Sequence, residues 1–165
     1  MAYSQHTIYG GGLVAVIIAA CVAGIAVTGG PGEARKERED RARQQAVSDT
    51  ALALACYHQA FGEIPEDLTL VENELARVTS EAHQQDACTQ AEIRKDPVTG
   101  EDFRLTRQAG VVTQICAEFA TGTPSGPYNR YSYNPTRAVI PDLGEPRETG
   151  GERCFDLNLS AKLEF

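Results

Sequence analysis

IYGGGLVAVIIAACVAGIAVT, residues Ile8–Thr28, is an unbroken run of 21 residues without a charged side chain. A helix needs about 20 apolar residues to cross the roughly 30 Å hydrocarbon core of a bilayer. The first charged side chain of the sequence is Glu33. The run therefore predicts one transmembrane helix. Residues 1–32 comprise the N-terminal tail, the transmembrane helix and a Gly/Pro break. Residues 33–165 form a small soluble domain.

Two alternatives to an uncleaved anchor remain open. A secretory signal has a basic start and an apolar core of about 7–15 residues, whereas this run is longer and no Lys or Arg precedes it. The stretch Ile18-Ala19-Ala20-Cys21 is similar to the lipobox of bacterial lipoproteins, in which the cysteine is lipidated. We expect the uncleaved anchor, with Cys21 as a small apolar residue of the helix.

Small residues recur every four positions along the run. They let helix backbones approach closely in lipid, where packing replaces the hydrophobic effect. The pattern indicates docking against another transmembrane helix, although small residues are common in any membrane span. One track holds Ala15, Ala19 and Ala23, and a second holds Gly12, Ala20, Gly24 and Thr28.

Charge and cysteine content limit what the soluble part does and where it resides. The net charge of −8 argues against nucleic acid, because a nucleic-acid-binding domain presents a basic stripe. An even number of cysteines in a small extracytoplasmic domain suggests disulfides. Reduced buried thiols are an alternative, and a zinc site is disfavoured because no C-x-x-C spacing occurs. The four cysteines are Cys56, Cys88, Cys116 and Cys154.

The membrane side of the domain is contested within the sequence. Basic residues follow the apolar run and none precedes it, which by the positive-inside rule keeps the domain in the cytoplasm. The paired cysteines favour an oxidising compartment. The basic residues are Arg35, Lys36, Arg38, Arg41 and Arg43.

Two helices are expected after the Gly/Pro break. The first starts near Glu33 or Ala34 and ends at Phe61, before Gly62. Its opening, EARKEREDRARQQ, is almost fully polar, so it is expected to stand in water or at the lipid headgroups. Its apolar face is Val47, Ala51, Leu54, His58 and Phe61. The second helix opens at Pro65–Leu68, with Leu68, Val71, Leu75, Val78 and Ala82 on one face.

From Asp96 the pattern changes to strands. Asp96–Gly100, DPVTG, has the chemistry of a turn. Strands are expected over Asp102–Arg107, Val111–Phe119 and Arg153–Leu159, with a long Pro/Gly/Asn-rich connection over residues 120–152. In the second strand the odd-numbered residues from Val111 to Phe119 form the apolar face. The fold class is α+β, a small antiparallel sheet of about three strands packed on helices.

The cysteines lie within these elements, but their connectivity is not fixed by sequence. Cys88 follows the second helix and is a candidate partner of Cys56. Cys116 and Cys154 lie in strand segments, which allows a cross-strand or a sheet-to-loop bridge.

Residues 30–159 resemble a recurrent bacterial module of unknown function that follows the last membrane helix of uncharacterised membrane proteins. The resemblance implies an extracytoplasmic domain in the bacterial inner membrane, that is, a periplasmic one, and it transfers no active site. The matching pieces are GGPGEAR (Gly29–Arg35), YHQAFGEIP (Tyr57–Pro65), DPVTG (Asp96–Gly100), ICAEF (Ile115–Phe119) and GERCF (Gly151–Phe155).

The layout of one long helix leading into a small antiparallel sheet is also similar to type II secretion pseudopilins. Pseudopilins carry a basic leader and a glutamate near the start of the apolar segment, and this chain has neither.

No catalytic, cofactor or metal motif occurs, so no enzyme, cofactor or metal is expected. The loop Gly126–Arg137 instead combines tyrosine and arginine, the residues enriched at interface hot spots. The alternative is that these tyrosines fold over the sheet edge. The loop residues are Tyr128, Arg130, Tyr131, Tyr133 and Arg137.

Together these features predict a non-catalytic single-pass accessory subunit. Its expected partners are other membrane protein subunits and the lipid bilayer, with no small-molecule substrate. The alternative is a pseudopilin-like component of a secretion or surface-appendage machine.

Overall fold

The computed structural model describes residues 5–28, 30–81, 87–123 and 136–163. Contacts between residues divide the chain into two compact units, Met1–Glu37 and Arg38–Phe165. The division falls inside the helix that follows the Gly/Pro break. The domain boundary expected at the break itself stays a prediction.

The apolar run forms helix α1, Gln5–Thr28. Every side chain described in it, over residues 12–24, is exposed. In the part of the chain that the structure describes, no helix combines the length and the apolar character that a membrane crossing requires.

Helix α2, Pro31–Phe61, is the longest element. It begins with proline at the first helical position, where the missing N–H costs nothing. The amides of Glu33 and Ala34 donate to the carbonyl of Gly30 at 3.0 and 3.2 Å. The helix ends at Phe61, as predicted, and Gly62 follows with φ of +88°, a conformation that favours glycine.

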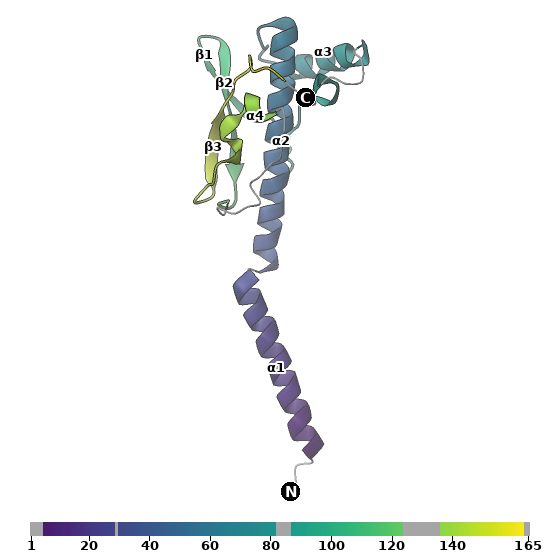
Figure 1. Ribbon diagram of the computed structural model, residues 1–165, viewed down its shortest axis with the longest axis vertical. Coiled ribbons are helices and arrows are strands. Elements are labelled where there is room, and N and C mark those ends of the chain that lie inside the picture. Colours follow the sequence, from purple (N-terminus) through teal and green to yellow (C-terminus); the bar gives the residue numbers. More distant parts are fainter. Residues whose placement is uncertain (1–4, 29, 82–86, 124–135, 164–165) are drawn as a thin grey trace. The chain divides into compact units, whose positions relative to one another are not determined.

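The buried surface of α2 is wider than its predicted stripe. Figure 1 shows the sheet on one side of α2 and α3, Leu68–Glu81, on the other, so the helix packs on two sides. Val47, Ala51 and Leu54 are fully buried, as expected. His58 is only half-buried, and Phe61 is 41% exposed at the helix end, where the stripe prediction is wrong.

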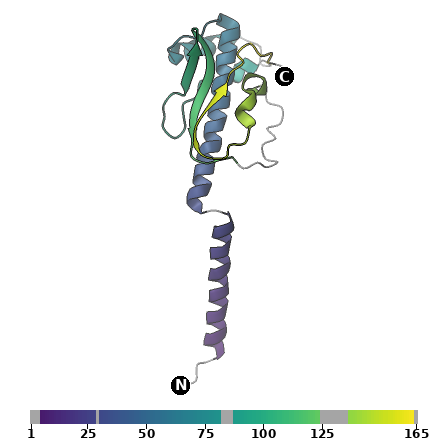
Figure 2. The same cartoon turned by 90° about the vertical axis from the view of Figure 1, so that its left-hand side faces the viewer.

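Three antiparallel strands form one sheet in the order β1-β2-β3 (Figure 2). They are β1, Arg104–Gln108, β2, Val111–Phe119, and β3, Gly151–Asp156. The predicted α+β class is confirmed, as are the bounds of β2. The last strand was predicted too late and too long. Its start, Gly151, already pairs with Phe119, and beyond Asp156 the amide of Asn158 bonds to Val139 instead.

A β-bulge changes which residues of β2 face the core. Pairing with β1 runs from Thr106↔Gln114 directly to Arg107↔Val112, so one residue of β2 is skipped. An extra residue in one strand inverts the alternation on either side of it. Ile115, Ala117 and Phe119 are buried, as predicted, but Val112 is buried while Val111 is 53% exposed. The predicted inward position of Val111 is therefore wrong.

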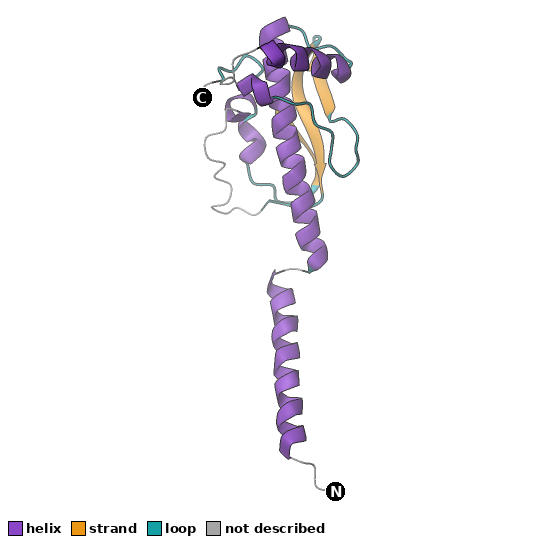
Figure 3. Ribbon diagram, turned by 90° about the vertical axis from the view of Figure 1, so that its right-hand side faces the viewer, coloured by secondary structure: helices purple, strands orange, loops and turns teal. Residues whose placement is uncertain are grey.

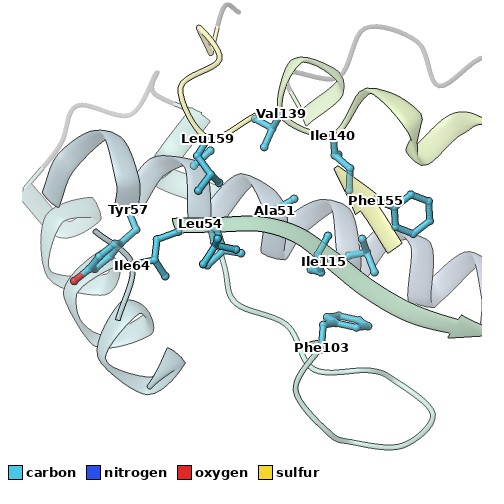
Figure 4. Close-up of a cluster of buried hydrophobic side chains, with 14 of the residues drawn as sticks. Ala51, Leu54, Tyr57, Ile64, Phe103, Ile115, Val139, Ile140, Phe155 and Leu159 are labelled. Carbon is cyan, nitrogen blue, oxygen red and sulfur yellow. The ribbon is translucent and has the colours of Figure 1, made fainter. Parts of the chain in front are cut away.

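The core lies between α2 and the sheet. In Figure 4, Leu54 and Ala51 of α2 lie beside Ile115 of β2, with Phe155 of β3 close by. Figure 3 shows α2 running along the strands when the domain is viewed from its helical side. Two short elements not predicted from sequence, α4 (Thr136–Val139) and η3 (Pro141–Gly144), add Val139 and Ile140 to this core.

The N-terminus of α3 is set by an aspartate. The carboxylate of Asp67 accepts from the amide of Thr69 at 2.9 Å, which satisfies one of the free donors of a helix start. Val71 and Leu75 are buried and Leu68 packs against the core. The predicted face of α3 is confirmed at these three positions, while the side chains of Val78 and Ala82 lie outside the described residues.

Candidate functional site

Three features of the structure are candidates for function: the exposed helix α1, a buried group of charges, and two disulfides. On α1 both predicted tracks of small residues lie on exposed surface. Added Cβ atoms at Gly12 and Gly24 would meet nothing within 4 Å. Leucine therefore fits at these positions in the single chain. The track residues are Ala15, Ala19 and Ala23, and Gly12, Ala20 and Gly24.

The buried charges centre on Arg43 of α2. Its guanidinium donates to both oxygens of Asp96, Nε to Oδ2 at 2.6 Å and Nη2 to Oδ1 at 3.2 Å. Nη1 donates to Asp40 Oδ1 at 3.1 Å. The side chains of all three residues are at most 10% exposed. Such a two-pronged arginine–carboxylate pair fixes geometry as well as charge.

Asp40 connects this group to the end of β2. Its carboxylate accepts from the amides of Ala120 and Thr121 at 2.8 and 2.7 Å, and from the Thr121 hydroxyl at 2.7 Å. The expectation that EARKEREDRARQQ stands in water is therefore wrong on one face of its last turns, whereas Arg41, Ala42 and Gln45 are exposed as expected. On the buried face lie Asp40, Arg43 and Gln44.

In addition to pairing with Arg43, Asp96 stabilises the Asp-Pro turn. Its Oδ1 accepts from the amides of Val98 and Thr99 at 2.8 and 3.3 Å, and its amide donates to Glu101 at 2.8 Å. Burial opposes its ionisation, but the hydrogen bonds from Arg43 and these amides outweigh burial and hold the pKa of Asp96 below its usual value.

A second buried arginine, Arg147, lacks such pairing. Its guanidinium carbon lies 3.8 Å from the centroid of the Phe119 ring, a cation–π contact. Its Nε and Nη1 have no hydrogen-bond partner in the described structure. Burial lowers the pKa of Arg147, and the charge of Asp40 opposes that shift. Arg43 and Arg147 together balance the charges of Asp40 and Asp96.

All four cysteines of the domain are paired. Cys56 of α2 bonds to Cys88 of η1, Ala87–Gln90, and Cys116 of β2 bonds to Cys154 of β3. The second bridge joins residues that face each other in the strand register. The candidate pairing of Cys88 with Cys56 is confirmed, and the cross-strand form of the second bridge is the one observed. Cys21 is free and exposed.

The face of the sheet turned away from α2 surrounds the second bridge with polar groups. Arg104, Cys116 and Cys154 are register partners and share one face of the sheet. Arg104 Nη2 lies 2.7 Å from Glu152 and 3.7 Å from Cys154 Sγ. The hydroxyl of Thr106 lies 3.8 Å from Cys116 Sγ. Polar hydrogens therefore reach both sulfurs of this disulfide.

Most of the predicted partner loop lies outside the described residues. That applies to Tyr128, Arg130, Tyr131 and Tyr133, whereas Arg137 is exposed on α4. The side chains of His6 and His83 are not described either, and among the described residues no three His, Cys, Asp or Glu side chains gather as a metal site.

Comparison with protein-family models, curated proteins and solved structures finds no match. The resemblances to the bacterial module and to pseudopilins therefore stay predictions.

The charge cluster is the feature that sequence reasoning missed. DPVTG was recognised as a turn, and its aspartate was the available signal. Nothing local shows that this aspartate pairs with an arginine 53 positions earlier. Hydrogen bonds of Arg43, Asp40 and Asp96 join α2, the end of β2 and the Asp-Pro turn, so the contribution of this cluster is structural.

Proposed function

We propose that the chain is a non-catalytic, single-pass membrane accessory subunit whose C-terminal domain stabilises a larger membrane protein complex. The observation that carries the proposal is the surface of α1, which is apolar over residues 12–24, the positions whose side chains are described. A helix that is apolar all round lies in lipid or inside a larger protein. Its large exposed side chains, 53–68% accessible, are Leu13, Val14, Val16, Ile17, Ile18 and Val22.

The small-residue tracks support a partner helix as one of the covers of α1. Alanine and glycine allow two backbones to approach closely in lipid. The open space around Gly12 and Gly24 is consistent with a neighbour seated there. Lipid is proposed to cover the remaining apolar surface.

Disulfides support a periplasmic location for the domain. Structural disulfides are rare in reducing compartments, and the structure pairs all four cysteines of the domain. The basic residues after the apolar run favour the cytoplasm, which is the alternative location. We give the disulfides more weight, because each joins two cysteines that lie far apart in the sequence and that only folding brings into contact.

The proposal is tested by co-purification in a mild detergent. Wild-type chain is expected to bring down stoichiometric partner subunits. Changing Ala19→Leu together with Gly24→Leu is expected to weaken that association about tenfold or more, since leucine separates backbones that need to touch.

The matched control is Val16→Leu with Val22→Leu, which adds bulk to already large positions of the same helix and is expected to leave co-purification unchanged. Equal recovery of partners with both double variants would contradict docking through the tracks. Recovery of no partner with the wild-type chain would contradict the accessory role itself.

One observation favours the alternative, a pseudopilin-like component. A 31-residue helix leads into a three-stranded antiparallel sheet, which is the layout that suggested the resemblance. This alternative requires N-terminal processing and homopolymers. Intact-mass measurement of the mature protein separates the two proposals, because retention of Met1 removes the pseudopilin one.

A further inference from the structure

We propose that the Cys116–Cys154 disulfide is a thiol–disulfide exchange site, opened by a protein or small molecule that carries a dithiol. The inference goes beyond the accessory role and does not depend on it. The two bridges of the domain are alike in burial, since each joins a cysteine that is 3% exposed to one that is half-buried. The sulfurs of the sheet bridge lie beside a guanidinium and a hydroxyl group.

Each sulfur of the sheet bridge has a polar group within reach. Arg104 Nη2 lies 3.7 Å from Cys154 Sγ, and Thr106 Oγ1 lies 3.8 Å from Cys116 Sγ. A thiolate is a far better leaving group when a cation or a donor stabilises it.

The exchange proceeds in two balanced steps. A thiolate of the partner attacks the half-buried Cys154 Sγ, the S–S bond breaks, and Cys116 Sγ leaves with the bonding electrons beside the Thr106 hydroxyl. The mixed disulfide now joins the partner's first sulfur to Cys154 Sγ. The partner's second thiolate attacks that first sulfur and releases Cys154 as a thiolate beside Arg104. The protein takes up two electrons and two protons, and the partner becomes a disulfide.

The sheet does not require the bridge to keep its register. β2 and β3 pair over six residue positions, from Gln114↔Asp156 to Phe119↔Gly151. Ile115 and Phe155 hold the opposite face in the core. Cys56–Cys88 instead ties η1 to α2 across a separation of 32 residues, with no strand pairing at that point.

The test is partial reduction of the full-length chain in detergent. The free thiol of Cys21 is first blocked with iodoacetamide. Dithiothreitol is then added at a low concentration, new thiols are trapped with N-ethylmaleimide, and peptides are mapped by mass spectrometry. Cys116 and Cys154 are expected to be trapped as a pair before Cys56 and Cys88, with the far-UV circular dichroism unchanged.

Variants identify the groups responsible. Arg104→Gln and Thr106→Val are each expected to slow opening of the sheet bridge roughly three- to tenfold, and Arg104→Lys to restore most of the rate. Arg153→Gln is the control, because Arg153 neighbours Cys154 in sequence and forms a similarly exposed ion pair, with Glu145. It is expected to leave the rate unchanged.

Three results overturn the inference. One is Cys56–Cys88 opening first or at the same rate. Another is an equal change in the opening rate of the sheet bridge in the Arg104→Gln and Arg153→Gln variants. The third is loss of the folded circular dichroism signal when the sheet bridge opens, because the bridge is then a structural element and not an exchange site.

Discussion

Arg43 sits between two carboxylates that are themselves bonded to backbone amides of two other segments. Removing it leaves Asp40 and Asp96 buried without their cation, and breaking a buried pair in this way costs far more than the pair contributes. The sequence offered no sign of this. Periodicity marks a polar helix face as solvated, and burial of Arg43 depends on a turn far along the chain.

Arg43→Met is expected to lower the free energy of unfolding by about 3–5 kcal/mol. Methionine keeps the apolar stem and removes the charge. The measurement is urea unfolding followed by circular dichroism.

Arg77→Met is the control, since Arg77 pairs with Glu74 in solvent, 61% and 42% exposed, and such pairs contribute at most about 1 kcal/mol. Equal losses in the two variants would contradict the structural role assigned to the buried cluster.

Asp142 of η3 is expected to lower stability at neutral pH. Burial raises its pKa, and the charges of Asp156 and Glu145 add to the rise. Its Oδ1 has no partner among the described residues. A carboxyl whose folded-state pKa lies above its unfolded-state pKa loses stability as pH rises through the folded-state value. Asp142→Asn is therefore expected to raise the melting temperature at about pH 7 and to leave it unchanged at about pH 3.

The check is thermal unfolding of both proteins across that pH range. The reverse dependence, with the variant more stable only in acid, would contradict the assigned sign of the shift.

At the scale of elements, periodicity predicted what is locally encoded. Gly62 indicated the end of α2. The alternation of side chains indicated both ends of β2, and Pro65–Leu68 indicated the start of α3. The bulge was not predictable, because it is defined by pairing between strands. α4 and η3 were missed because four-residue elements carry no period, and Val139 and Ile140 are buried by tertiary packing.

The turn after β2 packs its backbone directly against the segment before β3. A Cβ at Gly150 would lie 2.7 Å from the carbonyl oxygen of Ala120. Gly150→Ala is expected to destabilise the domain by about 1–3 kcal/mol, because backbone cannot give way as a side chain does.

Gly144→Ala is the matched control, since a Cβ there meets nothing within 4 Å and its effect is expected to stay within about 0.5 kcal/mol. Chemical denaturation measures both variants. A neutral Gly150→Ala would contradict the close backbone contact.

Across the whole molecule, helix α1 and the C-terminal domain differ in where their apolar side chains lie. α1 exposes apolar side chains, while the domain buries its apolar core and pairs its four cysteines. The sequence predicted this difference from one uncharged run and an even cysteine count. It could not predict a partner, because the shape and chemistry of a binding surface arise from residues that only folding brings together.

The proposed location of α1 within a bilayer is tested most directly through Cys21, the free thiol of α1. Membranes containing the chain are washed with alkaline carbonate and treated with a charged, membrane-impermeant maleimide, before and after dissolution in SDS. If α1 lies within the bilayer, the chain stays in the membrane pellet and Cys21 reacts only after SDS. A chain released by carbonate, or a Cys21 that reacts equally fast in intact membranes, would contradict it.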